Sequence, residues 1–560
     1  MRSTASRGLR SARFGLQQTE RLISGAAASS RFSSVQATGR PVQSRSHLHR
    51  NFTTAVRLRQ QTREDDGVER KWSTPLAKQL AEAIELTGPI PLASFMRMCL
   101  TADIGGYYTG AIKENRDQFG LKGDFVTSPE ISQVFGELCG IWFVTEWLAQ
   151  GRQSKGVELV EVGPGRGTLM DDMLRTIQRF PAMANSIDAI YMVEASPELR
   201  AAQKRLLCGE DAPMTESKVG YHSVCKYNSL PIVWTETIKS IPIAPEKMPF
   251  IIAHEFFDAL PIHAFQCVSV PASQTTPPPS PSSPSQPPSN FSSPSTKTTH
   301  PTIQWREMLV SPTPPGSTHE SLRTPPTQSR ATPPPDFQLT LSPSPTRHSL
   351  YLPESSPRYR AIKSTTGPGA LLEICPDLFL YTADFATRIG GSAAHPKPRP
   401  SGAALILDYG PGDGSVPTNS LRGIRAHRRV SPFAEPGLTD LSADVDFGAI
   451  AEAATRASEG VEVHGPVEQG TFLELMGIRE RAEALARAAL SSCTTSSGPG
   501  SGGSGGEEEG KKKAADVERA WRRLVDRGPG GMGKVYKALA ILPENEGRRR
   551  PVGFGGDVVQ

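Results

Sequence analysis

The chain contains no C-x-x-C pair and no long apolar run, and both absences exclude classes of protein. Its 7 cysteines are scattered along 560 residues. This spacing disfavours a zinc ribbon or a disulfide scaffold and makes a reducing compartment the default. No stretch of about 18 consecutive apolar residues occurs, so the sequence predicts no transmembrane helix.

The main part of the chain also lacks a surplus of basic charge. The net charge is +5, but residues 1–63 hold twelve arginines, no lysine and one acid, Glu20, and therefore carry +11. The remaining residues sum to −6, a balance that indicates no nucleic-acid-binding surface. We interpret the arginine- and serine-rich residues 1–60 as a mitochondrial transit peptide, with a basic tail lacking structure as the alternative.

Proline is concentrated in one region. Of the 50 prolines, 22 lie between Pro271 and Pro357 among serine and threonine, a composition that cannot bury a continuous core. We predict Pro/Ser-rich disordered insertions there, with short strands at 302–311, 337–342 and 350–354. The predicted order is a transit peptide (1–60), a helical extension (74–151), the first part of the folded domain (152–270), the insertions (271–357), its second part (367–490), a flexible glycine–serine linker (496–515) and a closing strand (530–543).

Short apolar segments alternate with helical patterns along the folded domain. Residues 157–163, 189–196 and 404–410 are short, mostly apolar segments that predict strands, and helical residues 168–180 and 197–207 follow the first two. The alternation predicts the α/β class, with a Rossmann-like doubly wound parallel sheet and right-handed crossovers.

A glycine-rich turn follows the first of these strands. Gly163, Gly165 and Gly167 leave the backbone open to a ligand where a helix begins. The G-x-G-x-G spacing departs from the G-x-G-x-x-G of dinucleotide-binding proteins, and with Glu161 ahead of it has the form seen in S-adenosylmethionine-dependent methyltransferases. Glu194 ends the next strand, where a carboxylate can accept hydrogen bonds from both ribose hydroxyls. We predict that these five residues bind S-adenosyl-L-methionine; a nicotinamide or flavin nucleotide, or a purely structural turn, is the alternative.

Six longer segments resemble one known family: residues 123–142, 157–175, 251–266, 408–412, 440–454 and 465–478. They are similar to the MidA-like methyltransferases, mitochondrial protein arginine methyltransferases that assist the assembly of respiratory complex I. The resemblance spans roughly residues 74–543 without the proline tracts. It implies a class I methyltransferase fold with an N-terminal helical extension, a location in the mitochondrial matrix, and symmetric dimethylation of an arginine on a core subunit of the iron–sulfur arm. The proline tracts, the glycine–serine segment and His254, where bacterial relatives tend to carry Asn, depart from the family pattern.

The acceptor site is expected after the strand that ends near residue 254, because ligands in this fold bind at the carboxyl ends of the strands. There we predict that Glu255 holds a guanidinium by two hydrogen bonds, that Asp258 supports it, and that His254 lies near the methyl group. A turn in which Glu255 pairs with a structural arginine is the alternative.

Other polar residues are weaker candidates. Asp124, Ser128 and Glu130 stand where a loop enters a helix and could close over the cofactor, although Ser128 could equally be a plain helix cap. Asp408 could face the same crevice or pack at a strand end. Three aspartates look like a metal cluster, but caps and turns explain them and we assign no metal: Asp440, Asp444 and Asp446.

Two other functions stay open beside an arginine methyltransferase: a methyltransferase for a small molecule, and an assembly chaperone that binds S-adenosylmethionine with catalysis secondary. A kinase is excluded although residues 528–538 look like a kinase glycine-rich loop, since only 22 residues follow Ala538 and no catalytic loop can fit. We interpret that segment as the closing strand with its lead-in.

Overall fold

The computed structural model describes residues 70–110, 127–271, 302–322, 333–495 and 504–555, and from Lys71 onward they form one unit. The predicted transit peptide, residues 1–60, lies outside the described residues. So do residues 272–301 and 323–332 of the proline-rich region.

The main sheet has nine strands in the order β16-β17-β12-β7-β2-β3-β6-β5-β4. The five central strands from β12 to β6 are mutually parallel, and the others pair antiparallel. The chain runs outward through β2, β3 and β6 on one side, then returns to β7 and β12 on the other, so the order reverses between β2 and β7. The doubly wound sheet predicted from the sequence is confirmed. The strand bounds are β2 Val157–Val162, β3 Ile187–Val193, β4 Thr215–Glu216, β5 Tyr221–Val224, β6 Pro231–Thr235, β7 Met248–His254, β12 Ala403–Tyr409, β16 Val461–Glu468 and β17 Tyr536–Pro543.

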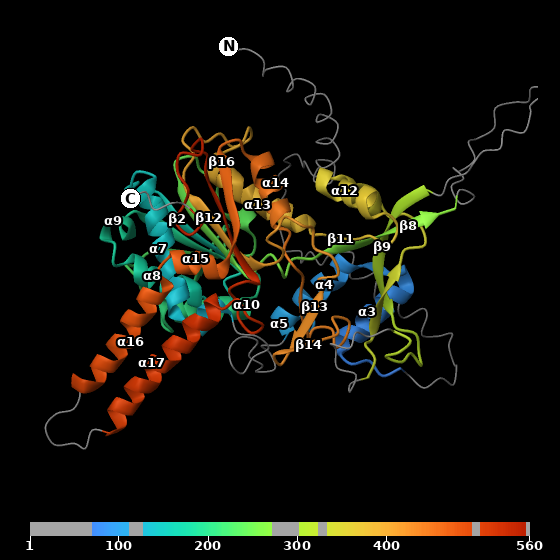
Figure 1. Cartoon of the computed structure of the whole chain (residues 1–560), viewed down its shortest axis with the longest axis horizontal. Coiled ribbons are helices and arrows are strands. Elements are labelled where there is room, and N and C mark those ends of the chain that lie inside the picture. The colour runs from blue at the N-terminus through green and yellow to red at the C-terminus, as the bar shows by residue number, and fades with distance from the viewer. Residues whose placement is uncertain (1–69, 111–126, 272–301, 323–332, 496–503, 556–560) are drawn as a thin grey trace, which may run out of the picture. The chain divides into compact units, whose positions relative to one another are not determined.

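Helices cover both faces of this sheet (Figure 1). Alternate residues of β2 show why: Leu159 packs in one core with α7 (Gln133–Ala149) and α8 (Thr168–Ile177), whereas Val160 packs in a second core with α13 (Pro376–Gly390) and α14 (Phe447–Ala457). All six residues of β2 are buried, as expected for a central parallel strand. Helix α10 (Pro197–Cys208) follows β3 and begins at the cap residue Ser196.

A second, antiparallel sheet is assembled from distant parts of the chain. Its path is β1 (Ile90–Pro91), β9 (Thr302–Pro312), β8 (His263–Val270) and β11 (Leu371–Ile374), with β10 (Phe337–Leu341) also paired to β9. Helices α3 (Pro75–Thr87) and α4 (Leu92–Thr101) of the predicted helical extension pack against it. The strands predicted at 302–311 and 337–342 are thus confirmed. A third, small sheet contains β13 (Arg422–Arg425), β14 (Arg428–Val430) and β15 (Asp440–Ser442).

The strand predicted at 350–354 is wrong. Residues 347–351 form helix α11 (Arg347–Tyr351), and a single 3-10 turn, Leu352–Glu354, follows. The Thr346 hydroxyl accepts a hydrogen bond from the Ser349 backbone N–H, and the Ser349 hydroxyl accepts one from the Thr346 backbone N–H, a reciprocal cap that starts a helix. Pro353 lacks the N–H that a strand ladder needs.

The flexible linker predicted at 496–515 is also wrong for its second half. Residues 496–503 lie outside the described part, but helix α17 spans Ser504–Val525 and packs along α16 (Ile478–Thr495), the two projecting together from the body (Figure 1). Acids followed four residues later by bases support the helix, as the Glu509–Lys513 ion pair at 2.8 Å shows. The prediction of a linker followed from the glycine and serine content of the segment and did not consider the spacing of its charged residues.

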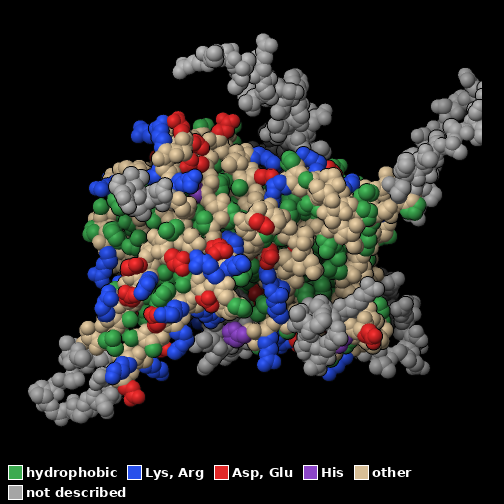
Figure 2. Space-filling view, in the orientation of Figure 1, with side chains coloured by type: hydrophobic (Ala, Val, Ile, Leu, Met, Phe, Trp, Pro, Cys, Tyr) green, Lys and Arg blue, Asp and Glu red, His purple; other side chains and the backbone are tan. Residues whose placement is uncertain are grey.

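The other short helices are α5 (Tyr107–Gly110), α6 (Ser128–Ile131), α9 (Pro181–Ala184), α12 (Pro357–Thr366), α15 (Gln469–Leu475) and a 3-10 turn at Ile238–Ser240. Among the helices of the described residues, none combines the length and apolarity needed to cross a bilayer. On the face drawn in Figure 2, basic and acidic side chains are interspersed instead of gathering into a field of one sign.

Candidate active site

The glycine turn leaves β2 at the reversal of strand order, where doubly wound folds bind ligands. Gly163, Gly165 and Gly167 all have left-handed backbone angles, with φ of +68°, +52° and +84°. A Cβ on Gly163 would lie 2.7 Å from a ring carbon of Phe256, which real contacts do not allow. Gly167 stands at the start of α8 with no side chain to occupy the helix N-terminus. The sequence therefore needs glycine here for conformation and for space.

Two carboxylates flank this turn. Glu161 in β2 is buried, and its Oε2 accepts no hydrogen bond from any residue that the structure describes. Burial, together with nearby Glu194, raises the pKa of the Glu161 carboxyl well above its usual range. Glu194 follows β3; its carboxylate accepts hydrogen bonds from the Ser196 backbone N–H at 2.8 Å and from the Gln203 amide at 3.3 Å. Burial nevertheless raises the pKa of Glu194 to about 7.

A second turn leaves β7 beside the first. Glu255 begins it with φ of +48°, a conformation that non-glycine residues rarely adopt. Asp408, at the end of β12 and fully buried, accepts the backbone N–H groups of Phe256, Phe257 and Asp258 with its Oδ2, at 3.2, 2.9 and 3.3 Å. Of the two interpretations of Asp408, its contacts support a structural one: the carboxylate shapes the turn that carries the candidate acceptor residues.

The side chains of this second turn leave three buried polar atoms without a hydrogen bond among the described residues: His254 Nε2, Glu255 Oε1 and Asp258 Oδ1. His254 Nε2 and Glu255 Oε1 lie 3.4 Å apart but are not aligned for a hydrogen bond. The other oxygen of Asp258 accepts the Tyr409 hydroxyl. Buried polar atoms are normally paired, so three orphans in one place indicate a missing ligand.

Burial also decides the charge of these groups. Burial first, and then repulsion by Asp258, raises the pKa of Glu255 well above its usual range, and burial lowers the pKa of His254 to about 3. His254 is therefore a neutral imidazole at any physiological pH. A cation that entered would favour the ionised forms of Glu255 and Asp258 and would not be repelled by His254.

Both turns line one pocket of about 690 Å³. Seven of the eight predicted site residues line it: Glu161, Gly163, Gly165, Glu194, His254, Glu255 and Asp258. That list is complete except for Gly167, which serves the start of α8 instead. The structure thus brings the predicted cofactor residues and the predicted acceptor residues together.

Several lining residues were missed by sequence reasoning. Tyr108, Tyr409 and Tyr536 come from three distant segments, and Arg422 lies over the Tyr409 ring with its guanidinium carbon 4.5 Å from the ring centre. The sequence offered only a weak signal, a tyrosine next to Asp408 and another inside the kinase-like segment. Nothing local indicated that these side chains meet.

The residues predicted to close over the cofactor are only partly within the described structure. Asp124 lies outside the described residues. The residue that caps α6 is Thr127 and not Ser128, because Glu130 bonds back to the Thr127 backbone N–H at 3.2 Å in a capping box. Ser128 Oγ is buried, and no described residue bonds it.

The three aspartates set aside as caps and turns are held by protein groups. Asp446 accepts the Ala449 backbone N–H at 2.9 Å and pairs with Arg358, Asp444 pairs with Arg422, and Asp440 accepts the Tyr108 hydroxyl at 3.3 Å.

A family model described as "Putative S-adenosyl-L-methionine-dependent methyltransferase" matches residues 138–467, more than half of the chain. The chain belongs to this methyltransferase family. The glycine turn and most of the residues that line the pocket lie within the matched range, and the cofactor of the methyltransferase is S-adenosyl-L-methionine, as predicted.

Curated relatives of the methyltransferase extend over most of its length. "Protein arginine methyltransferase NDUFAF7, mitochondrial" of Rattus norvegicus is 35% identical over 417 residues, which are 74% of this chain and 76% of the relative. The Drosophila melanogaster homologue of that name is 35% identical over 471 residues, or 84% and 85% of the two chains. The mitochondrial location predicted from the N-terminal composition agrees with these names, whereas the matrix stays a prediction.

A solved structure from Burkholderia thailandensis, bound to S-adenosyl-homocysteine, has the same fold as the methyltransferase. Its TM-score is 0.55 at 20% identity, and the match covers 84% of this chain and 92% of that chain. The predicted fold class is therefore confirmed independently of the sequence similarity.

Proposed function

We propose that the chain is a protein arginine N-methyltransferase of the mitochondrial matrix, and that its acceptor is an arginine on a core subunit of the iron–sulfur arm of complex I. The curated relatives carry the name of protein arginine methyltransferases. The observation that carries the proposal is local: buried oxygens of Glu255 and Asp258 have no partner among the described residues and face the pocket that the glycine turn lines.

The cofactor end of the pocket would be held by the first turn. Glu194 would accept the ribose hydroxyls, and the backbone at Gly163 and Gly165 would lie against the methionine portion. S-Adenosyl-L-methionine supplies an electrophilic methyl group on a sulfonium. The sulfonium would favour the ionised form of Glu161, whose Oε2 no described residue bonds.

At the acceptor end, Glu255 and Asp258 would bind the guanidinium by charge-assisted hydrogen bonds. The nitrogen–methyl bond forms as the sulfur–methyl bond breaks, and one proton leaves the nitrogen. Glu255 can take that proton, because burial raises the pKa of its carboxyl and so favours the protonated form. Neutral His254 fits beside the transferring methyl without repelling either cation.

The test is incubation of the full chain with isotope-labelled S-adenosylmethionine and a mitochondrial extract, followed by mass spectrometry of the labelled band. We expect label on an arginine of a complex I subunit, and symmetric dimethylarginine after hydrolysis. Label in a low-molecular-mass fraction would support the small-molecule alternative. Binding of the cofactor without any label would support the assembly chaperone.

Two variants test whether methyl incorporation depends on the proposed acceptor site. Glu255→Gln should lose incorporation, whereas Glu216→Gln, at an exposed position on the edge strand β4, should keep it. Equal incorporation by both variants would contradict the acceptor assignment while leaving the cofactor assignment intact.

A further inference from the structure

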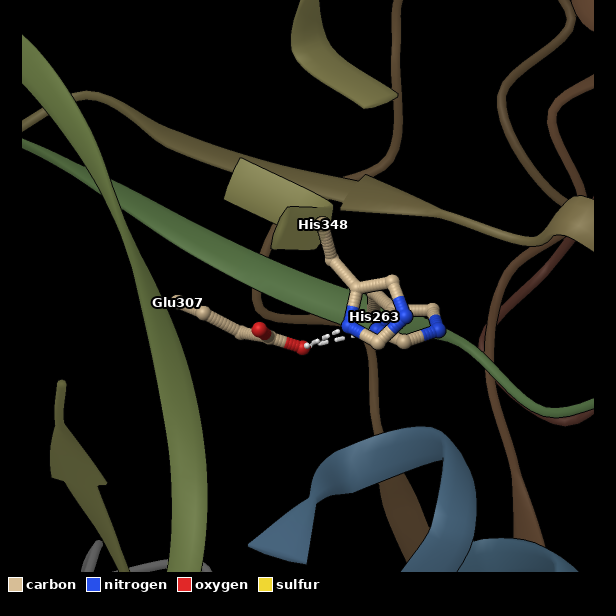
Figure 3. A group of neighbouring side chains, drawn as sticks. All are labelled: His263, Glu307 and His348. Carbon is tan, nitrogen blue, oxygen red and sulfur yellow. Dashed lines mark hydrogen bonds and ion pairs between the residues drawn. The ribbon is translucent and has the colours of Figure 1, made fainter. Parts of the chain in front are cut away.

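Outside the pocket, two histidines and a glutamate converge on one point (Figure 3). His263 is the first residue of β8, Glu307 lies within β9 and His348 lies in α11. Their candidate ligand atoms all lie within 4.8 Å of one another. His263 Nδ1 is 2.8 Å and His348 Nδ1 is 3.2 Å from the same oxygen, Glu307 Oε1.

The fold fixes this convergence. Strands β8 and β9 pair antiparallel with Phe265 opposite Glu307, which brings the start of β8 close to that glutamate. Thr346, the cap of α11, donates its hydroxyl to the other oxygen, Glu307 Oε2, and so ties the helix to the carboxylate. The rings of His263 and His348 lie with their centroids 4.2 Å apart.

We propose that His263, Glu307 and His348 bind a divalent transition-metal ion, with zinc as the best match. Two imidazoles and one carboxylate are a donor set that zinc prefers. Ligand bonds of about 2.0–2.2 Å at tetrahedral angles place ligand atoms roughly 3.3 Å apart, close to the contacts seen here. The Thr346 hydroxyl supplies the outer hydrogen bond that such carboxylates need.

The site is open on one side. Glu307 and His263 are buried, but the His348 side chain is 42% exposed, so water can reach a fourth position on the ion. None of the three residues lines the large pocket, which separates the ion from methyl transfer. Strand β8 begins at the proposed ligand His263, five residues after Asp258. The ion would therefore hold the segment that follows the acceptor turn against β9 and α11.

The sequence predicted no metal, because the three ligands lie 44 and 41 residues apart along the chain and no spacing pattern connects them. The alternative to a metal is that both imidazoles donate to Glu307 Oε1 as a hydrogen-bonded group only.

The experiment measures binding of Zn²⁺ to the full chain by competition with a chromophoric chelator, and the visible spectrum of the Co²⁺ form. We expect one equivalent of tight metal and the absorption of a four- or five-coordinate cobalt site. His348→Ala removes an exposed ligand and should preserve the fold, yet it should weaken binding by about 100-fold or more. His395→Ala, an exposed histidine on a loop, is the matched control and should bind as the parent does.

Thermal unfolding gives a second readout. Zinc should raise the melting temperature of the parent and of the His395→Ala control, and should leave that of His348→Ala unchanged. Thr346→Val should weaken metal binding by about 10- to 100-fold, because it loosens the carboxylate without removing a ligand. The proposal is overturned if the parent binds no stoichiometric metal, or if His348→Ala binds metal as tightly as the parent.

Discussion

Replacing Glu255 with glutamine isolates the charge of the acceptor turn from its shape. Glutamine keeps the volume of the side chain and one oxygen acceptor, so packing around His254 should persist. A hydrogen bond to a charged group contributes a net free energy of about 1.5–3 kcal/mol. Since about 1.4 kcal/mol is a factor of ten in rate, Glu255→Gln should lower kcat/KM for the protein acceptor by about 10- to 150-fold.

The loss should depend on pH, and the direction follows from burial. Burial and the neighbouring Asp258 raise the pKa of Glu255 in the free enzyme, so the carboxyl is ionised only as the pH rises through that value. A guanidinium needs the ionised form, and below that pKa it must displace a proton to bind. kcat/KM of the parent should therefore increase with pH, by at most about tenfold per unit, and then level off. The variant has no such carboxyl, so the ratio of parent to variant should grow over the same range.

The assay pairs calorimetry of S-adenosylmethionine binding with the initial rate of methyl incorporation, both measured across the whole pH range in which parent and variant stay folded. Cofactor affinity should be nearly the same in parent and variant, because the cofactor does not depend on that carboxylate. A ratio of rates that stays constant with pH would refute the charge argument, and normal incorporation would reduce the turn to a structural element. Unfolding of the variant at low temperature would point to a buried structural pair instead.

Four further outcomes are expected. Gly163→Val should abolish cofactor binding in calorimetry, because its side chain would meet Phe256 and its φ of +68° is strained for a branched residue. Cofactor affinity should fall as the pH drops below about 7, where Glu194 becomes protonated and stops accepting the ribose hydroxyls, and unchanged affinity at pH 5.5 would contradict that role. Deleting residues 272–299 should leave the melting temperature nearly unchanged, since the flanking strands β8 and β9 already pair up to their ends. Asp408→Ala should lower the free energy of unfolding by about 1–3 kcal/mol and reduce incorporation more than cofactor binding, because three backbone N–H groups lose their acceptor.

The parallel core was predictable because burial on both faces leaves a mark in the sequence. Strands β2, β3, β7 and β12 are mostly apolar segments, and the glycines after β2 mark a turn with left-handed backbone angles that favour glycine. The acid and glycine residues of the pocket were found because they lie near the carboxyl ends of β2, β3 and β7.

Strand pairings between distant segments were not predictable, because a local sequence pattern indicates a strand but not which other strand it pairs with. Strand β1 pairs with β9 although more than 200 residues separate Ile90 from Val310, and β17 enters the main sheet between β12 and β16. The same limit explains the missed tyrosines. Tyr108 belongs to the helical extension, and only the packing of that extension against the sheets brings it into the pocket.

The charges of the pocket also explain how one site could receive two cations and release their products. Glu161, Glu194 and Asp258 are buried and the Glu255 side chain is 12% exposed, and desolvation raises the pKa of each carboxyl. In the empty pocket they favour their neutral forms, and a sulfonium with a guanidinium beside it would ionise them, so binding should release protons to the solvent. Transfer of the methyl group turns the sulfonium into a neutral thioether and frees one proton from the guanidinium. The pocket then holds one cation fewer, a carboxylate regains a proton, and the attraction that held the cofactor is weakened. Proton release on binding, measured by calorimetry in buffers of different ionisation heat, should therefore be larger for the substrate pair than for S-adenosylhomocysteine with the methylated product; equal release would mean that these carboxyls do not respond to the bound charge.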